Sequence, residues 1–82
     1  MDERIVESAL DRLRPGLTPD GFDLRLYEIA GDDVHVVLAA RPDACLDCLV
    51  PDELMTSMIE DLIRAHDASL RRVYLVKQGF DA

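Results

Sequence analysis

The amino-acid sequence predicts an α+β fold in two layers, with the order α-β-β-α-β and a three-stranded mixed sheet covered on one face by two helices. Two segments carry apolar residues at helical spacing, one at the start of the chain and one after Pro51. Three other segments alternate between apolar and polar residues, as half-buried strands do. The 82 residues are enough for one domain, residues 1–82, with one small hydrophobic core.

The first helix is expected over residues 2–14, where the acidic residues at the start and the arginines at the end match the helix dipole. Pro15 and Gly16 are expected to end this helix, because proline lacks a backbone donor and glycine favours helix ends. Residues 15–21 then form a loop that contains the turn signal Asp20-Gly21. Arg14 is expected to pair with Asp20 or Asp23 and so to hold this loop in place.

The first two strands are expected at 22–29 and 34–40, and residues 30–33 form the hairpin turn between them. So short a connection makes these two strands antiparallel neighbours. A second helix is expected from Pro51 to about His66, and a third strand at 70–77. If this third strand lies beside the second, the two run parallel and the helix forms the crossover between them.

The net charge of −8 argues against nucleic-acid binding as the function, because an acidic surface repels phosphate groups. No apolar run is long enough to cross a membrane. The chain starts Met1-Asp2-Glu3, unlike the basic start of a secretory signal, and we therefore expect a cytoplasmic protein. No Ser/His/Asp or Cys/His arrangement stands out, so the sequence does not predict an enzyme.

Cys45 and Cys48 are the only two cysteines, and they lie three positions apart in the irregular segment before the second helix. In the cytoplasm such a pair is more often metal-binding or redox-active than a structural bridge. Iron–sulfur clusters and structural zinc usually have four protein ligands. One chain therefore offers half a site, and a second copy or an external thiol must complete it.

Two motifs resemble the C-terminal domain of NifU and the Nfu-type iron–sulfur carriers. The segment 14–24, RPGLTPDGFDL, resembles the R-P-x-[VL]-x-x-D-G-G-D-[VIL] segment that opens this domain, and 44–48, ACLDC, is similar to the end of its G-A-C-x-x-C. Ile59-Glu60 matches an I-E pair in the family's helix, and the resemblance extends over roughly residues 5–76. The chain diverges around the CxxC loop, where Asp43 replaces a family glycine.

The resemblance implies an iron–sulfur cluster scaffold or carrier, not an enzyme. Cys45 and Cys48 of two protomers would ligate a shared [4Fe-4S] cluster, which the protein would pass to apo iron–sulfur proteins. The implied partners are a second copy of the chain and these recipients, with no nucleic acid and no membrane. Four acidic residues flank the thiols and predict a cluster that is labile or has a low reduction potential; they are Asp43, Asp47, Asp52 and Glu53.

Other interpretations of the cysteine pair stay open. The chain could be an interaction module that binds no cluster, a dimer that binds zinc through four cysteines, or a thiol redox protein. The two cysteines could also be small buried residues that pack under a loop. His35 is expected on the solvent side of its strand and His66 at a helix end, and neither is expected to bind a metal.

Overall fold

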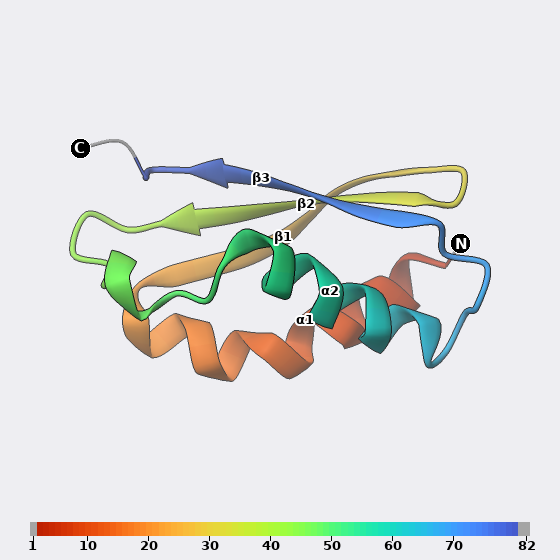
Figure 1. Ribbon diagram of the computed structural model, residues 1–82, viewed down its shortest axis with the longest axis horizontal. Helices are drawn as coiled ribbons and strands as arrows, with labels where there is room; N and C mark the ends of the chain where they lie inside the picture. The colour runs from red at the N-terminus through yellow and green to blue at the C-terminus, as the bar shows by residue number, and fades with distance from the viewer. Residues whose placement is uncertain (1, 81–82) are drawn as a thin grey trace.

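The computed structural model describes residues 2–80 and has the expected α+β architecture. A three-stranded mixed sheet forms one layer, and both helices cover the same face of it (Figure 1). No helix among the described residues is both long and apolar enough to cross a membrane. The elements in chain order are α1 (Glu3–Leu17), the short 3-10 helix η1 (Thr18–Asp20), β1 (Phe22–Ala30), β2 (Asp33–Ala40), the short 3-10 helix η2 (Leu46–Cys48), α2 (Asp52–Arg64) and β3 (Arg72–Gln78).

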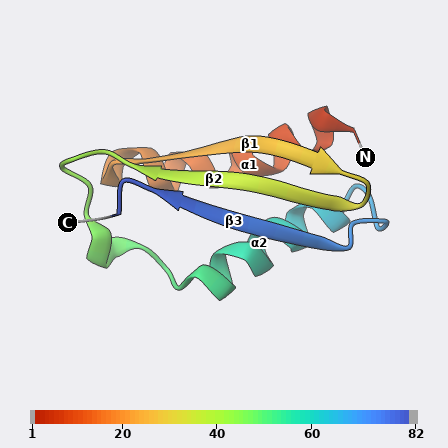
Figure 2. The same ribbon diagram turned by 90° about the horizontal axis from the view of Figure 1, so that it is seen from above.

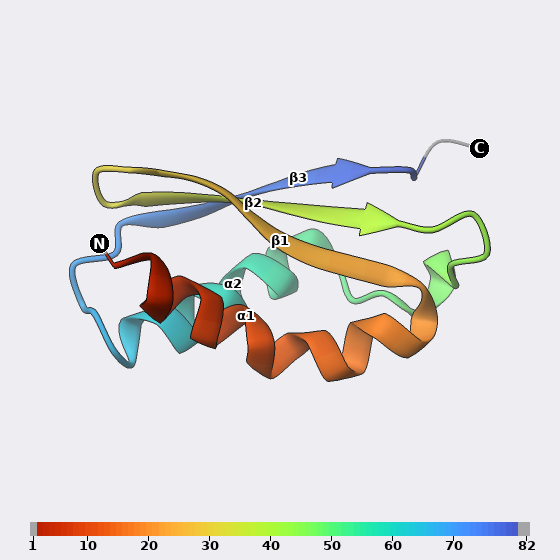
Figure 3. The same cartoon turned by 180° about the vertical axis from the view of Figure 1, so that it is seen from behind.

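The sheet has the strand order β1-β2-β3, so β1 and β3 are its two edges. As expected, β1 is antiparallel to β2, and β3 lies beside β2 and runs parallel to it. Seen from above, α1 lies toward the β1 side of the sheet and α2 lies alongside β3 (Figure 2). The view from behind shows α1 running beneath β1 (Figure 3).

The hydrophobic core lies between the sheet and the two helices. No polar or charged residue is buried within residues 2–80. Both helices and all three strands contribute to the core, because each presents one apolar face to the other layer. The buried hydrophobic residues are Val6, Ala9, Leu10, Leu17, Phe22, Leu24, Val34, Val36, Leu38, Met55, Ile59, Ile63, Leu70 and Val73.

The prediction that Pro15 and Gly16 end the first helix is wrong, since α1 continues to Leu17. Pro15 is solvent-exposed, and so is Asp11, whose carbonyl loses its helical partner because proline has no N–H. Water can satisfy that carbonyl, so the proline is tolerated here. The extra turn is stabilised because it buries Leu17, which is 8% exposed and belongs to the core.

The ends of the later elements also differ from the prediction. The hairpin turn is shorter than expected, since β1 continues to Ala30 and β2 begins at Asp33. The second helix ends at Arg64 rather than about His66, and the third strand spans Arg72–Gln78 rather than 70–77. Leu70 is nevertheless buried, at 4% exposed. The apolar pattern therefore identified Leu70 correctly as a core residue, although it lies before the first residue of β3.

A β-bulge at Tyr27 interrupts the alternation of β1. Leu26 pairs with Val36 and Glu28 pairs with His35, which leaves Tyr27 without a partner on β2. The extra residue shifts the alternation by one position, so Ile29 packs against the core and Tyr27 is 71% exposed.

Candidate functional site

The two cysteines lie in the loop that joins β2 to α2, at one end of the molecule (Figure 1). Cys45 precedes η2 and Cys48 is its last residue. Both residues are exposed, so the interpretation of two cysteines buried under a loop is wrong. They form a disulfide with their Cα atoms 5.4 Å apart. The loop therefore holds both sulfur atoms at one accessible point, and reduction would release two adjacent thiols there.

Backbone hydrogen bonds attach the start of this loop to the turn between η1 and β1. The Cys45 N–H donates to the Asp20 carbonyl at 2.9 Å, and the Arg41 N–H donates to the Gly21 carbonyl at 2.8 Å. The Ala44 N–H closes a local turn by donating to the Arg41 carbonyl at 3.0 Å. The Asp20-Gly21 turn and the cysteine motif, which are far apart in the sequence, therefore form one structural unit.

Arg41 adds side-chain contacts to this unit. Its guanidinium donates to the Thr18 carbonyl at 2.7 Å and lies 3.7 Å from the Asp23 carboxylate. Sequence reasoning missed this role of Arg41. Its place at the end of a strand, directly before the irregular segment with the cysteines, is the signal that could have indicated an anchor.

The expected pairing of Arg14 with Asp20 or Asp23 is wrong. Because α1 continues past Gly16, Arg14 remains on the helix and contacts Asp11 and Glu7 on its own N-terminal side. Its Nε also donates to the Leu24 carbonyl at 3.0 Å, which ties α1 to β1. Burial opposes the charge of Arg14, but the hydrogen bonds and charges of the two carboxylates outweigh it, so the pKa of Arg14 is raised.

Apolar residues surround the cysteines. A depression of about 130 Å³ lies beside Cys48 between the two helices. Leu46, between the cysteines, and Leu54, on the first turn of α2, are 47% and 49% exposed. The depression is lined by Leu13, Gly16, Leu17, Cys48, Leu49, Val50, Met55 and Met58.

The four flanking acidic residues do not all gather at the sulfur atoms. Asp43 and Asp47 are exposed residues of the loop itself, and Asp47 lies within η2 between the two cysteines. Asp52 instead pairs with Lys77 on β3 at 3.1 Å, and Glu53 lines a groove between α2 and β3. Of the four acidic residues, Asp47 is therefore the one that lies between the two cysteines.

One chain offers two sulfur ligands at this loop. Residues 2–80 contain no group of three or more His, Cys, Asp or Glu side chains that could hold a metal ion. His35 stacks on Tyr74, with ring centroids 4.9 Å apart, and His66 is exposed just beyond α2. Neither histidine is brought to the cysteines.

Comparisons with known proteins show a partial similarity. No protein-family model matches the chain. The chain is 47% identical over 45 residues to "NifU-like protein 1, chloroplastic" of Oryza sativa subsp. japonica. The match covers 55% of this chain and 20% of the relative, so the chain spans about a fifth of that protein's length. This similarity supports the NifU-like resemblance for just over half of the chain.

Proposed function

We propose that the protein is an iron–sulfur cluster scaffold or carrier that holds a [4Fe-4S] cluster as its cargo and passes it to apo-proteins. The observation that carries this proposal is the exposed, adjacent pair Cys45 and Cys48 at the end of one loop. The similarity to a NifU-like protein adds the family context. Thiolates are the ligands that iron–sulfur clusters use most.

A cluster whose four thiolate ligands all come from this protein requires two protomers, since each supplies Cys45 and Cys48. The exposed side chains of Leu46, between the cysteines, and of Leu54, on the first turn of α2, would then become buried against the partner. This apolar contact would offset the repulsion between two chains that each carry a net charge of −8. We therefore propose a homodimer that forms around the cluster.

The disulfide must be reduced before a cluster can bind. Two electrons and two protons from a dithiol or glutathione reductant convert Cys45–Cys48 into two thiols, and the thiols lose their protons when they bind iron. The oxidised protein offers no thiolate. The redox state of this one bond therefore decides whether the chain can accept its cargo.

Anaerobic reconstitution tests the proposal. The protein is reduced with dithiothreitol, supplied with ferrous iron and sulfide, desalted, and analysed for iron, sulfide and oligomeric state. We expect a coloured dimer that retains iron and sulfide, and we expect Cys45→Ser and Cys48→Ser variants to retain neither. A folded, reduced protein that remains colourless and monomeric would contradict the proposal and favour an interaction module without a cluster.

Metal analysis separates the cluster from a zinc site, because zinc accepts the same four thiolates. Iron together with sulfide assigns a cluster, whereas stoichiometric zinc with no sulfide assigns a zinc-bridged dimer. Transfer is measured separately, by mixing the loaded protein with an apo [4Fe-4S] enzyme and following recovery of that enzyme's activity. Activity that recovers no faster than with free iron and sulfide would contradict the carrier role.

A further inference from the structure

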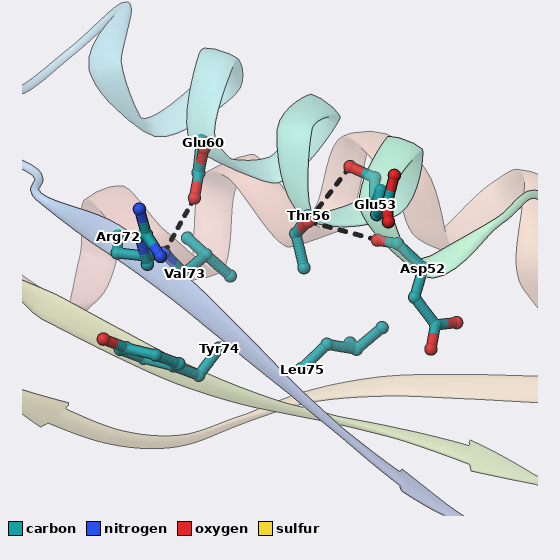
Figure 4. Close-up of a pocket in the computed structure, with 8 residues that line it drawn as sticks. All are labelled: Asp52, Glu53, Thr56, Glu60, Arg72, Val73, Tyr74 and Leu75. Carbon is teal, nitrogen blue, oxygen red and sulfur yellow. Dashed lines mark hydrogen bonds between the residues drawn. The ribbon is translucent and has the colours of Figure 1, made fainter.

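A groove runs between α2 and the free edge of β3 (Figure 4). Its volume is about 390 Å³. The groove starts at the N-terminal end of α2, four residues after Cys48, and extends toward the start of β3. It is lined by Asp52, Glu53, Thr56, Glu60, Arg72, Val73, Tyr74 and Leu75.

The pairing of the strands determines which backbone groups of β3 face this groove. Ala30 and Asp33 pair across the two-residue hairpin, and the Arg41 N–H bonds to Gly21 at the other end of the same strand pair. The odd-numbered amides of β2 therefore face β1, and the even-numbered ones face β3. Because Val34 lies opposite Val73, the amides of Val73, Leu75 and Lys77 point away from β2 to the free edge.

One of these three amides already has a partner. The Val73 N–H donates to the Glu60 carboxylate at 3.0 Å, which confirms the direction of the edge amides (Figure 4). Within residues 2–80, no side chain caps the amides of Leu75 and Lys77 in this way. An edge strand with unpaired donors and acceptors is a template for pairing with another extended segment.

The charges along the groove indicate what kind of segment it fits. Asp52, Glu53 and Glu60 contribute three carboxylates from α2, whereas Arg72 is the one cation in its lining. Asp52 already binds the Lys77 ammonium at 3.1 Å, so the wall accommodates a cationic side chain. Edge-to-edge pairing of two copies of this chain is disfavoured, because each copy carries a net charge of −8.

We propose that this groove binds an extended peptide segment of another protein that carries a lysine or arginine. The segment adds a fourth strand to the sheet by hydrogen bonding to the backbone at Leu75 and Lys77, and its cation pairs with Glu53. The groove starts four residues after Cys48, so one end of it follows directly after the cysteine loop along the chain. The proposal rests on the sheet edge and on the charges of the groove, and it does not require a bound cluster.

Titration by NMR tests the proposal with the disulfide form, which cannot bind a cluster. The probe is a synthetic peptide of alternating valine and lysine with the length of β3, and its matched control carries glutamate in place of lysine. We expect the lysine peptide to shift the amide signals of Leu75 and Lys77 and to slow their hydrogen exchange, with a smaller change at Val73. The glutamate peptide should leave these signals unchanged.

Two pairs of variants separate the charge contact from the backbone pairing. Glu53→Gln should weaken binding of the lysine peptide by about twofold to fivefold, whereas Glu3→Gln, which removes the same charge from the start of α1, should not change it. Lys77→Pro removes an amide that β2 does not use and should abolish binding, whereas Lys77→Ala should retain it. Circular dichroism checks that each variant is folded.

Several results would overturn the proposal. Equal binding of the lysine and glutamate peptides would show that the charge of the groove does not select the segment. Signal shifts confined to β1 or to the open face of the sheet would place the contact elsewhere. Shifts at Leu75 and Lys77 that grow with protein concentration in the absence of peptide would assign the edge to a second copy of the chain. Because the peptide titration uses the disulfide form, an absence of peptide binding would not contradict the cluster proposal. A failed cluster reconstitution would likewise not contradict the proposal of a peptide-binding groove.

Discussion

Gly21 is in backbone contact with Ala44, the residue that precedes the first cysteine. A Cβ atom added to Gly21 would lie 2.7 Å from the Ala44 Cα, closer than real Cβ atoms approach. Gly21 also has a φ of 94°, in the left-handed region that favours glycine. Together with the Cys45 N–H bonded to the Asp20 carbonyl, this close approach positions the cysteine loop against the start of β1.

Replacing Gly21 with alanine should therefore both destabilise the protein and displace the cysteine loop. We expect the free energy of unfolding to fall by about 1–3 kcal/mol, because a non-glycine residue is strained at this φ and the Ala44 backbone must also move. Urea denaturation measures the stability. The amount of iron retained after anaerobic reconstitution shows whether the displaced cysteine loop can still bind a cluster.

The matched control for this variant is Gly16→Ala. Gly16 lies inside α1, and an added Cβ there meets no atom within 4 Å. We expect this change to stabilise the helix by about 0.5–1 kcal/mol and to leave cluster binding unchanged. If Gly21→Ala behaved like Gly16→Ala, the contact with Ala44 would not be holding the loop.

The sequence was sufficient to predict the sheet, because alternation and a short hairpin are local signals. It did not locate the end of α1, since the burial of Leu17 outweighs the local preference of Pro15 and Gly16. The bulge at Tyr27 has a local signal in the sequence, since the apolar residue Ile29 breaks the alternation of the strand.

The candidate site was predictable in composition but not in geometry. Spacing and family resemblance identified Cys45 and Cys48, whereas residues 41–50 have no periodicity from which exposure or loop path could be inferred. The partners of Arg14 and the anchor Arg41 depend on how α1, β1 and the loop meet. The contact between Glu60 and Val73 likewise joins two elements whose separation in the sequence gives no sign that they touch.

Asp33 should make stability depend on pH. Arg71 binds both oxygens of this carboxylate, and these hydrogen bonds hold the pKa of Asp33 below its ordinary value of 3.8. The bonded carboxylate thus stabilises the fold fully above about pH 4, and this stabilisation is lost as the pH falls through the lower, folded-state pKa. We expect Asp33→Asn to lower the melting temperature at pH 7, with a difference from the natural protein that shrinks toward zero in acid.

Asp32→Asn is the control for this prediction, since Asp32 lies next to Asp33 but its carboxylate makes no hydrogen bond among the described residues. Its melting temperature should follow that of the natural protein across the pH range. A difference between Asp33→Asn and the natural protein that stayed constant down to the most acidic pH at which the protein is folded would show that the carboxylate charge is not the cause.

Glu60 should contribute to stability through its bond to the β3 backbone. Glu60→Ala leaves the Val73 N–H without its acceptor and removes the 3.6 Å pair with Arg64. We expect the free energy of unfolding to fall by about 1–2 kcal/mol, as is typical for a hydrogen bond to a charged group, since the Glu60 side chain is only 21% exposed. Amide exchange at Val73 should accelerate more than at Val36 in the central strand. Glu53→Ala, two turns of α2 before Glu60, should change neither quantity appreciably. An equal loss of stability in both variants would show that the bond from Val73 to Glu60 is not the cause.

Asp47 should lower the reduction potential of the proposed cluster. It lies between Cys45 and Cys48 in η2, and a negative charge there disfavours the addition of an electron to a site that already carries thiolates. We therefore expect Asp47→Asn to raise the potential of the reconstituted protein, as measured by protein-film voltammetry. Asp61→Asn removes the same charge from the exposed side of α2 and should produce a smaller shift. An unchanged potential in Asp47→Asn, with the cluster intact, would show that this carboxylate does not act on the cluster.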